Sequence, residues 1–190
     1  MADCTRFEIE LLLRAFQHGL KLRRRDLSGL NLAGLDLSAT DFTGSLLVNT
    51  NLRDARLDGA CFSRCNLSGA DFSDARAPST NWNGAIARKS NFHKADLFNA
   101  SFVRSRFEES DFSETRAVQA NFVCAFFEHS RFHGADLSRA DFLGASLAGS
   151  AFVGADLQGA RMEAADAQDL LDAQQRSGLL RFDVFEDYYS

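Results

Sequence analysis

Residues 70–74 read ADFSD and residues 135–139 read ADLSR, and both are copies of one five-residue unit. The centre of the unit, position i, is apolar at every fifth residue from Leu22 to Met162, without insertion or deletion. This period fits neither the ~3.6 residues of a helical turn nor the ~2 residues of a strand. An internal repeat of this length is expected to determine the whole architecture.

The other positions of the unit also have preferred residue types. Position i−2 is small, position i−1 is usually polar and often Asp or Asn, and positions i+1 and i+2 are mostly polar or Gly. Alternation predicts that i−2 and i point inward while i−1 and i+1 point outward. Position i+2 would then turn a corner, which explains glycines such as Gly69 and Gly134. We expect Asp and Asn at i−1 to hydrogen-bond the nearby backbone.

These residues resemble the motif A(D/N)LXX of the pentapeptide-repeat family, and the resemblance covers about three quarters of the chain. It implies an all-β solenoid, a right-handed quadrilateral β-helix with four units in each coil. At ~4.8 Å per coil, the repeats would build about seven coils and a rod about 35 Å long. We therefore divide the chain into an N-terminal capping helix (1–20), the β-helix (21–163), and a C-terminal helix and apolar tail (164–190).

Residues twenty positions apart should stack in a four-sided coil, and their types sort by column. One column places Phe72, Phe92 and Phe112 in succession, and another places Phe62, Trp82 and Phe102 in succession. This sorting predicts stacked aromatic rings inside the rod.

The repeat is weakest over residues 76–89, which contain the small centres Ala77 and Ala87, the single proline Pro78 and the single tryptophan Trp82. Small centres beside a large ring suggest compensation of volume. We expect a local bulge here, and bulges often lie near functional surfaces.

The N-terminal region predicts a helix. Thr5 and Glu8 fit a capping box, and Gly19 is a suitable helix stop. The expected apolar face comprises Phe7, Leu11, Leu12, Ala15 and Phe16. This face would cover the first coil and hide its unpaired backbone edge.

After Met162 the repeat fades. A second helix is expected to begin at Asp166 and to end at Gly178, and an apolar segment follows it. This arrangement resembles the tail of the topoisomerase-protecting members of the family, in which a helix and the following segment pair two molecules. The tail therefore either closes the last coil or forms a homodimer. The candidates for a dimer interface are Leu170, Leu171, Leu179, Leu180, Phe182, Val184 and Phe185.

The net charge of −5 is distributed unevenly. Residues 1–25 carry a net charge of +3, residues 26–162 carry −3, and residues 163–190 carry −5. The short basic cluster at residues 23–25 does not make a basic face, which argues against direct nucleic-acid binding. The sequence shows neither a membrane-spanning stretch nor a signal-peptide pattern, so we expect a cytoplasmic protein with no membrane partner.

The sequence contains no recognisable catalytic or cofactor motif. His93 and His133 share an outward column but would lie ~10 Å apart, which is too far for one metal ion. Phosphate-loop, hydrolase and zinc-protease motifs do not occur. Cys65 is expected to point inward and Cys61 and Cys124 outward, as free thiols. A rod offers no deep substrate pocket. We therefore expect no enzymatic activity, no metal and no cofactor.

Outward apolar side chains mark a candidate partner-binding stripe on neighbouring corners of the C-terminal half. Its members are Phe98, Val103, Val118, Val123, Phe126 and Leu143. Together they exceed what isolated surface apolar residues would give. The alternative is that the tail or local side-chain packing covers them. Charged columns, such as Arg88 with Glu108 and Lys89 with Glu109, are expected to form ladder pairs.

Two hypotheses of function follow. The resemblance favours a DNA-mimicking protein that binds DNA gyrase or another type II topoisomerase and modulates it or protects it against inhibitors such as quinolones. Some bacterial family members do this as acidic rods of duplex-like width, and the acidic balance and dimer-like tail fit that role. The alternative is a scaffold that binds another protein through the apolar stripe.

Overall fold

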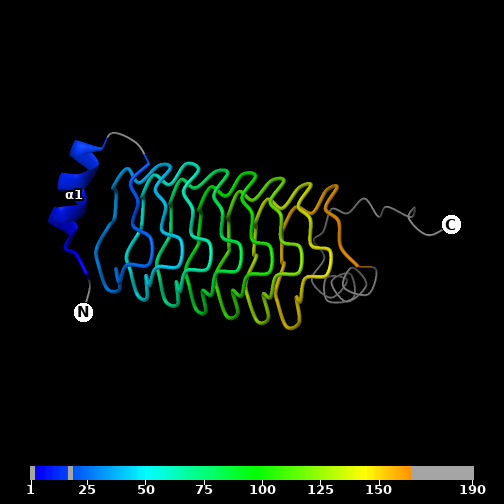
Figure 1. Ribbon diagram of the computed structural model, residues 1–190. Helices are drawn as coiled ribbons and strands as arrows, with labels where there is room; N and C mark the ends of the chain where they lie inside the picture. Colours follow the sequence, from blue (N-terminus) through cyan, green and yellow to red (C-terminus); the bar gives the residue numbers. More distant parts are fainter. Residues whose placement is uncertain (1–2, 17–18, 164–190) are drawn as a thin grey trace.

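The computed structural model describes residues 3–16 and 19–163, which form a straight rod with one helix at its N-terminal end (Figure 1). Parallel bridges join residue i−1 of each unit to the residue twenty positions later, from Lys21–Asp41 to Asp141–Arg161. Four five-residue units therefore complete one coil, as the resemblance implied. Each bridge is a single residue, and the described part of the rod contains no longer strand.

The coils are joined by backbone hydrogen bonds from three positions of each unit. In one unit, the N–H of Leu52 donates to the carbonyl of Asp71 (2.7 Å) and the N–H of Asp54 donates to Ser73 (3.0 Å). The N–H of Asn51 donates in the opposite direction, to Leu30 of the preceding coil (2.9 Å). The ladder thus pairs the N–H groups at i−1, i and i+2 without extended strands.

Position i+2 turns the corner, as predicted. Asp54 has a φ of 55° and Gly59 has a φ of 64°, and the same left-handed value recurs at position i+2 of the units along the rod. The N–H of Ala55 closes the turn by donating to the carbonyl of Leu52 (3.1 Å). A positive φ at the third residue of a four-residue turn is the type II geometry, which favours Gly at this position.

The Asp and Asn side chains at i−1 support these turns, which confirms the second expectation for the unit. Oδ1 of Asp71 accepts a hydrogen bond from the N–H of Ser73 (3.0 Å), and Oδ1 of Asn51 accepts one from Arg53 (3.0 Å). The i+1 N–H is the one that the coil-to-coil ladder leaves free, so the side chain supplies its partner.

The core is a set of interlocked columns. Every central residue from Leu22 to Leu157 is buried. Phe62 and Trp82 stack with ring centroids 4.3 Å apart, and Phe72 and Phe92 stack at 4.7 Å. Rings of neighbouring columns meet edge to face, as Phe72 and Trp82 do at 5.0 Å. The predicted aromatic stacks are therefore confirmed, and they lock each coil onto the next.

The bulge expected over residues 76–89 is wrong. Arg76 bridges both Arg56 and Asp96, so the ladder continues through this stretch in register. The ring of Trp82 lies flat between its stacked neighbours, and its Nε1 donates to Oγ1 of Thr80 (2.6 Å), so the ring needs no extra backbone. Pro78 stands at i+1, where no ladder N–H is required.

Helix α1 spans Arg6–Ala15, and its start follows the prediction. The N–H of Glu8 donates to Oγ1 of Thr5 (3.3 Å) while Oε2 of Glu8 accepts from the N–H of Thr5 (2.7 Å), which completes the capping box. The helix ends with Phe16 as its C-cap residue, three positions before the expected stop at Gly19.

The apolar face expected for this helix is wrong in part. Ile9 is fully buried against the first coil and Leu12 is partly buried, whereas Phe7, Leu11 and Phe16 are exposed by 70%, 56% and 57%. The guanidinium of Arg6 donates to the carbonyls of residues 31 and 33 in the first coil, which fixes the rotation of the helix. The second helix and the apolar tail expected after residue 163 lie outside the described residues.

Candidate interaction surface

Outward side chains form rows along the rod, because each position recurs after one coil. Val103, Val123 and Leu143 lie in one row, Phe98 and Val118 lie in a second row one side of the square away, and Phe126 lies in a third. Among these candidates only Phe126 is exposed, by 40%, and the others are partly buried. The guanidinium of Arg116 covers the ring of Phe98 at 4.8 Å. The stripe is therefore not one continuous exposed patch.

An exposed apolar row that includes Phe126 lies on one side of the rod, and sequence reasoning missed most of it. Leu46, Ile86 and Phe126 are exposed by 46%, 45% and 40%, and all three stand at position i−1. The bridges place them in a single row, with Asn66 and Arg106 on the coils between them, and the guanidinium of Arg106 lies over one face of the Phe126 ring at 5.3 Å. We call these three residues the apolar row. The available signal was an apolar residue at a position that usually carries Asp or Asn.

A row of arginines runs beside the apolar row. Arg24, Arg64 and Arg104 are exposed at the corner position i+2. Arg24 and Arg64 are each followed by a glycine at the same position of the next coil. A Cβ on Gly44 would lie 3.5 Å from Cγ of Arg24, and a Cβ on Gly84 would lie 3.7 Å from Cγ of Arg64. These glycines leave room for the arginine stems to lie along the corner. We call the three arginines the arginine corner.

The arginine corner differs from most basic residues of the rod. Arg116 pairs with Asp96 at 3.0 Å, Arg131 pairs with Asp111 at 2.7 Å and Arg161 pairs with Asp141 at 2.8 Å. The predicted ladder pairs also form, with Arg88 4.0 Å from Glu108 and Lys89 3.4 Å from Glu109. Within the described ranges, by contrast, the three corner arginines make no ion pair.

Two carboxylates near the C-terminal end of the rod also lack a basic partner among the described residues. Asp136 and Asp156 bridge each other on successive coils. Their Oδ1 atoms accept hydrogen bonds from the backbone N–H groups of Ser138 (3.1 Å) and Gln158 (2.9 Å), which leaves their charges uncompensated. Asp41 shows the contrast: burial raises its pKa, but hydrogen bonds from Arg23 and Thr43 outweigh this effect and bring the pKa to about 2.

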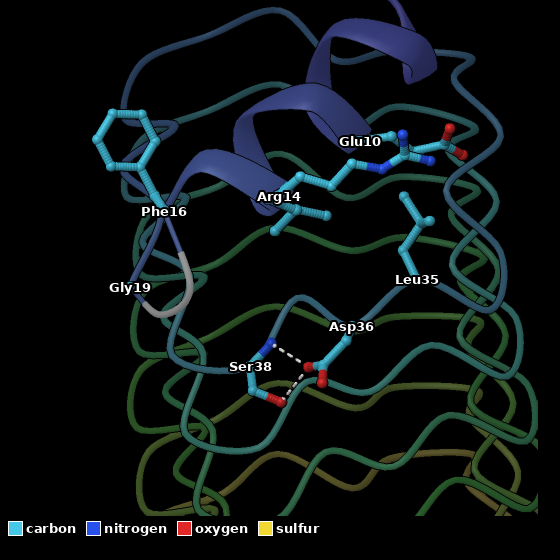
Figure 2. A pocket seen from close by; sticks show the side chains of 8 residues that line it. Glu10, Arg14, Phe16, Gly19, Leu35, Asp36 and Ser38 are labelled. Carbon is cyan, nitrogen blue, oxygen red and sulfur yellow. Dashed lines mark hydrogen bonds between the residues drawn. The ribbon is translucent and has the colours of Figure 1, made fainter.

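Two shallow grooves lie on the surface, where the rod form predicted no pocket. The first, about 590 Å³, separates α1 from the first coil, and its lining includes Glu10, Arg14, Leu35 and Asp36 (Figure 2). Its Asp36 carboxylate is engaged by the backbone and hydroxyl of Ser38 (3.1 and 2.6 Å). The second, about 550 Å³, contains ion pairs already described and is lined by Lys89, Ser90, Asn91, His93, Glu109, Asp111 and Arg131. Neither groove assembles a nucleophile with a base.

The cysteines lie as expected, with Cys65 buried, Cys61 partly buried and Cys124 exposed, and none of them forms a disulfide. Burial raises the pKa of the Cys65 thiol to about 12. In the part of the chain that the structure describes, no group of three His, Cys, Asp or Glu residues could hold a metal ion. The one described helix is too short and too polar to cross a membrane, and the other described residues form none that could.

Comparison with known proteins places the repeat in a family. The family description "Pentapeptide repeats" matches residues 26–64, 65–102, 100–139 and 127–163, in eight copies. A comparison with curated proteins found no match. Among solved structures, trypsin-treated QnrB1, a plasmid-mediated fluoroquinolone resistance protein, aligns with a TM-score of 0.59 and 23% identity over 83% of this chain and 89% of that chain.

A pentapeptide repeat protein from the Arabidopsis thaliana thylakoid lumen aligns with a TM-score of 0.45 and 26% identity, over 74% of this chain and 77% of that one. The alignment with QnrB1 shows a shared fold, the right-handed quadrilateral β-helix. The family match spans most of the repeat and agrees with the twenty-residue ladder of bridges. The chain is a member of the pentapeptide-repeat family.

Proposed function

We propose that this rod is a non-enzymatic binding protein that occupies the DNA site of a type II topoisomerase, DNA gyrase, and modulates the enzyme or protects it against inhibitors such as quinolones. The fold shared with QnrB1, a fluoroquinolone resistance protein, supports this choice of partner. Residues 19–163 form a straight rod and assemble no catalytic constellation, and this form is suited to binding along its length rather than to enclosing a substrate.

The charge density of the rod limits how such mimicry can work. Residues 26–162 carry sixteen Asp and Glu residues. Over a rod of about 35 Å this is one carboxylate per about 2 Å, close to the one charge per about 1.7 Å of duplex DNA. Thirteen Lys and Arg residues reduce the net charge of the same segment to −3. The mimicry must therefore come from local rows of unpaired carboxylates rather than from the net field of the rod.

The observation that carries the proposal is the row formed by Asp136 and Asp156. Their carboxylates stand on successive coils, ~4.8 Å apart along the axis, with no basic partner in the described residues. Residues 163–190 add seven acidic and two basic residues immediately after this row in sequence. Acidic residues are thus concentrated in the C-terminal part of the sequence.

The test is gyrase supercoiling, with and without a fluoroquinolone, titrated with the protein and with the double variant Asp136→Asn, Asp156→Asn. Asparagine keeps the Oδ1 acceptor of each turn and removes only the charge. We expect the wild-type protein to inhibit supercoiling or to protect the enzyme, and the double variant to need a roughly tenfold higher concentration, the effect of about 1.4 kcal/mol. The wild-type effect should weaken with added salt.

The matched control is Asp71→Asn, which changes the same position of the unit on another side of the rod. Asp71 also caps its own turn, through the N–H of Ser73 (3.0 Å), so the control carries the same local risk. If micromolar wild-type protein neither inhibits supercoiling nor protects the enzyme, the proposal is contradicted. Equal losses in the control and in the double variant would contradict the role of the Asp136–Asp156 row.

A scaffold function is the second candidate, and the exposed apolar row favours it. A partner bound there would bury Leu46, Ile86 and Phe126, so its binding would tolerate salt and would be lost in Phe126→Glu. Pairing of two rods through residues 164–190 also stays a prediction. Light scattering of the full chain and of a chain ending at Met162 distinguishes a tail-mediated dimer from a monomer.

A further inference from the structure

The arginine corner and the apolar row share an unusual period of two coils. Arg24, Arg64 and Arg104 stand forty residues apart, and so do Leu46, Ile86 and Phe126. The bridges show that one coil is twenty residues, so each row repeats every ~9.6 Å along the axis. The two rows are offset by one coil and lie two residues apart within the coil. A ligand for this surface therefore needs anionic and apolar groups that alternate with the same spacing.

We propose that the chain's own C-terminal segment, residues 179–188, docks along this corner. The segment reads LLRFDVFEDY, with Phe182, Phe185 and Tyr188 three residues apart and Asp183 and Glu186 three residues apart. An extended polyproline-II backbone has three residues per turn and rises ~9.3 Å per turn, so every third residue faces the same side. That repeat matches the ~9.6 Å spacing of the two rows within a few tenths of an ångström.

The spacing defines a register that runs toward the N-terminal end of the rod. Phe182, Phe185 and Tyr188 would pack on Phe126, Ile86 and Leu46, and Asp183 and Glu186 would face Arg104 and Arg64. The six residue-to-residue steps from Phe182 to Tyr188 span ~19 Å in this conformation. The four coils from Phe126 to Leu46 span ~19 Å as well.

The path of the chain allows the same molecule to supply this segment. The described residues end at Glu163, which holds position i+1 in the row of Val123 and Leu143, directly before the corner. Phe126 lies two coils from that point, or ~10 Å along the axis. The eighteen residues 164–181 are more than enough to cover this distance, since an extended residue spans ~3.3 Å.

Charge favours the same occupant. The three corner arginines lack carboxylate partners within the described residues, and residues 163–190 carry a net charge of −5. Docking would also cover the three exposed apolar side chains of the row. In the scaffold alternative the segment would have to leave the corner before a partner binds. The Asp136–Asp156 row lies on a different side of the rod, so gyrase binding can fail while this docking holds.

The test is the rate at which an arginine-specific protease such as clostripain cuts after Arg181 in the full-length protein, with each cut assigned by mass spectrometry. Cleavage after Arg176, before the docked segment, is the internal reference. We expect Arg64→Glu to accelerate the cut after Arg181 by about fivefold, the effect of one exposed ion pair. Glu186→Lys should accelerate it equally, and the double variant should restore the wild-type rate.

Arg139→Glu is the matched control, because Arg139 also stands at i+2, has a φ of 59° against 58° for Arg64, and lies over a glycine of the next coil. It should leave the rate unchanged. Glu186→Lys changes no residue of the rod, so it tests the pairing even if Arg64→Glu harms folding. Equal rates in the wild type and Glu186→Lys would overturn the proposal. A dimer mass by light scattering, with protection that falls on dilution, would overturn docking within one molecule.

Discussion

At the residue scale, the corner position i+2 shows how the repeat selects its amino acids. Its φ is positive at each i+2 position from Arg24 to Gly159, whether the residue is Gly or, as at Ala39 and Asp54, a residue with a Cβ. A left-handed backbone is most costly for side chains branched at Cβ. From Arg24 to Gly159 no i+2 position holds Val, Ile or Thr. The exclusion of branched residues is therefore as informative about the turn as the presence of glycine.

Replacing Ala39 with glycine tests the strain at this position. Ala39 has a φ of 55°, and a left-handed residue with a Cβ costs about 1–2 kcal/mol. Glycine also loses more conformational entropy on folding, which offsets about 0.5–1 kcal/mol of the relieved strain. Ala39→Gly should therefore stabilise the protein by about 0.5 kcal/mol. Urea unfolding measures the difference. Ala33→Gly, at position i+1 where φ is not positive, should destabilise instead, and a stabilising Ala33→Gly would contradict the explanation.

Asp41 predicts a pH dependence of stability. Its pKa in the folded protein is about 2, below the ordinary carboxyl value of 3.8, because of hydrogen bonds from Arg23 and Thr43. A depressed carboxyl pKa stabilises the fold above the unfolded pKa and loses that contribution as the pH falls through the folded pKa. The stability advantage of the wild type over Asp41→Asn should therefore be full at pH 7 and shrink between about pH 4 and pH 2. A constant difference in chemical unfolding across that range would contradict this assignment.

At the scale of the element, helix α1 is held by a small contact. Ile9 is its fully buried residue, while Phe7 is exposed by 70%. Ile9→Ala should cost the helix about 2–4 kcal/mol of local stability, and Phe7→Ser should change it by less than about 0.5 kcal/mol. Hydrogen exchange of the amides of Arg6–Ala15 measures the difference, with the amides around Trp82 as the reference. Faster exchange in Phe7→Ser than in Ile9→Ala would contradict the orientation of the helix.

The same helix shows where sequence reasoning reaches its limit. Its start was predictable, because a capping box is a local interaction between Thr5 and Glu8. Its buried face was not, because residues 7, 11 and 15 and residues 9, 12 and 13 both form apolar stripes at helical spacing. The choice between them depends on the contact of Arg6 with the first coil, which lies 25 residues further along the chain. Local pattern fixes an element, and a distant partner fixes its rotation.

The rod itself was more predictable, for the same physical reason. Inward positions, turn glycines and Asx side chains repeat with the period of the backbone. The structure assigned to one unit therefore predicts that of the next. The expected bulge failed because the width of the Trp82 ring is taken up by stacking and not by the backbone. The exposed members Leu46 and Ile86 escaped notice because they are forty residues apart, so their common row appears only when position i−1 is compared across alternate coils.

At the scale of the whole molecule, each coil contacts only its neighbours, so the rod behaves as a one-dimensional stack. The charge changes along the sequence, from +3 over residues 1–25 to −5 over residues 163–190. The two ends of the rod therefore offer different surfaces to a partner. The proposed mimicry uses Asp136 and Asp156 near the C-terminal end, and the exposed Phe7 of α1 lies at the other end.

The two-coil alternation at the arginine corner has a consequence for how such a rod can change length. Excision of residues 61–80 would remove one coil and leave the ladder in register, yet it would bring Gly44 beside Gly84 and Leu46 beside Ile86. Excision of residues 61–100 would instead place Arg104 after Gly44 and preserve the alternation. The backbone ladder tolerates the loss or gain of a single coil, whereas the alternating surface is preserved only when coils are lost or gained two at a time.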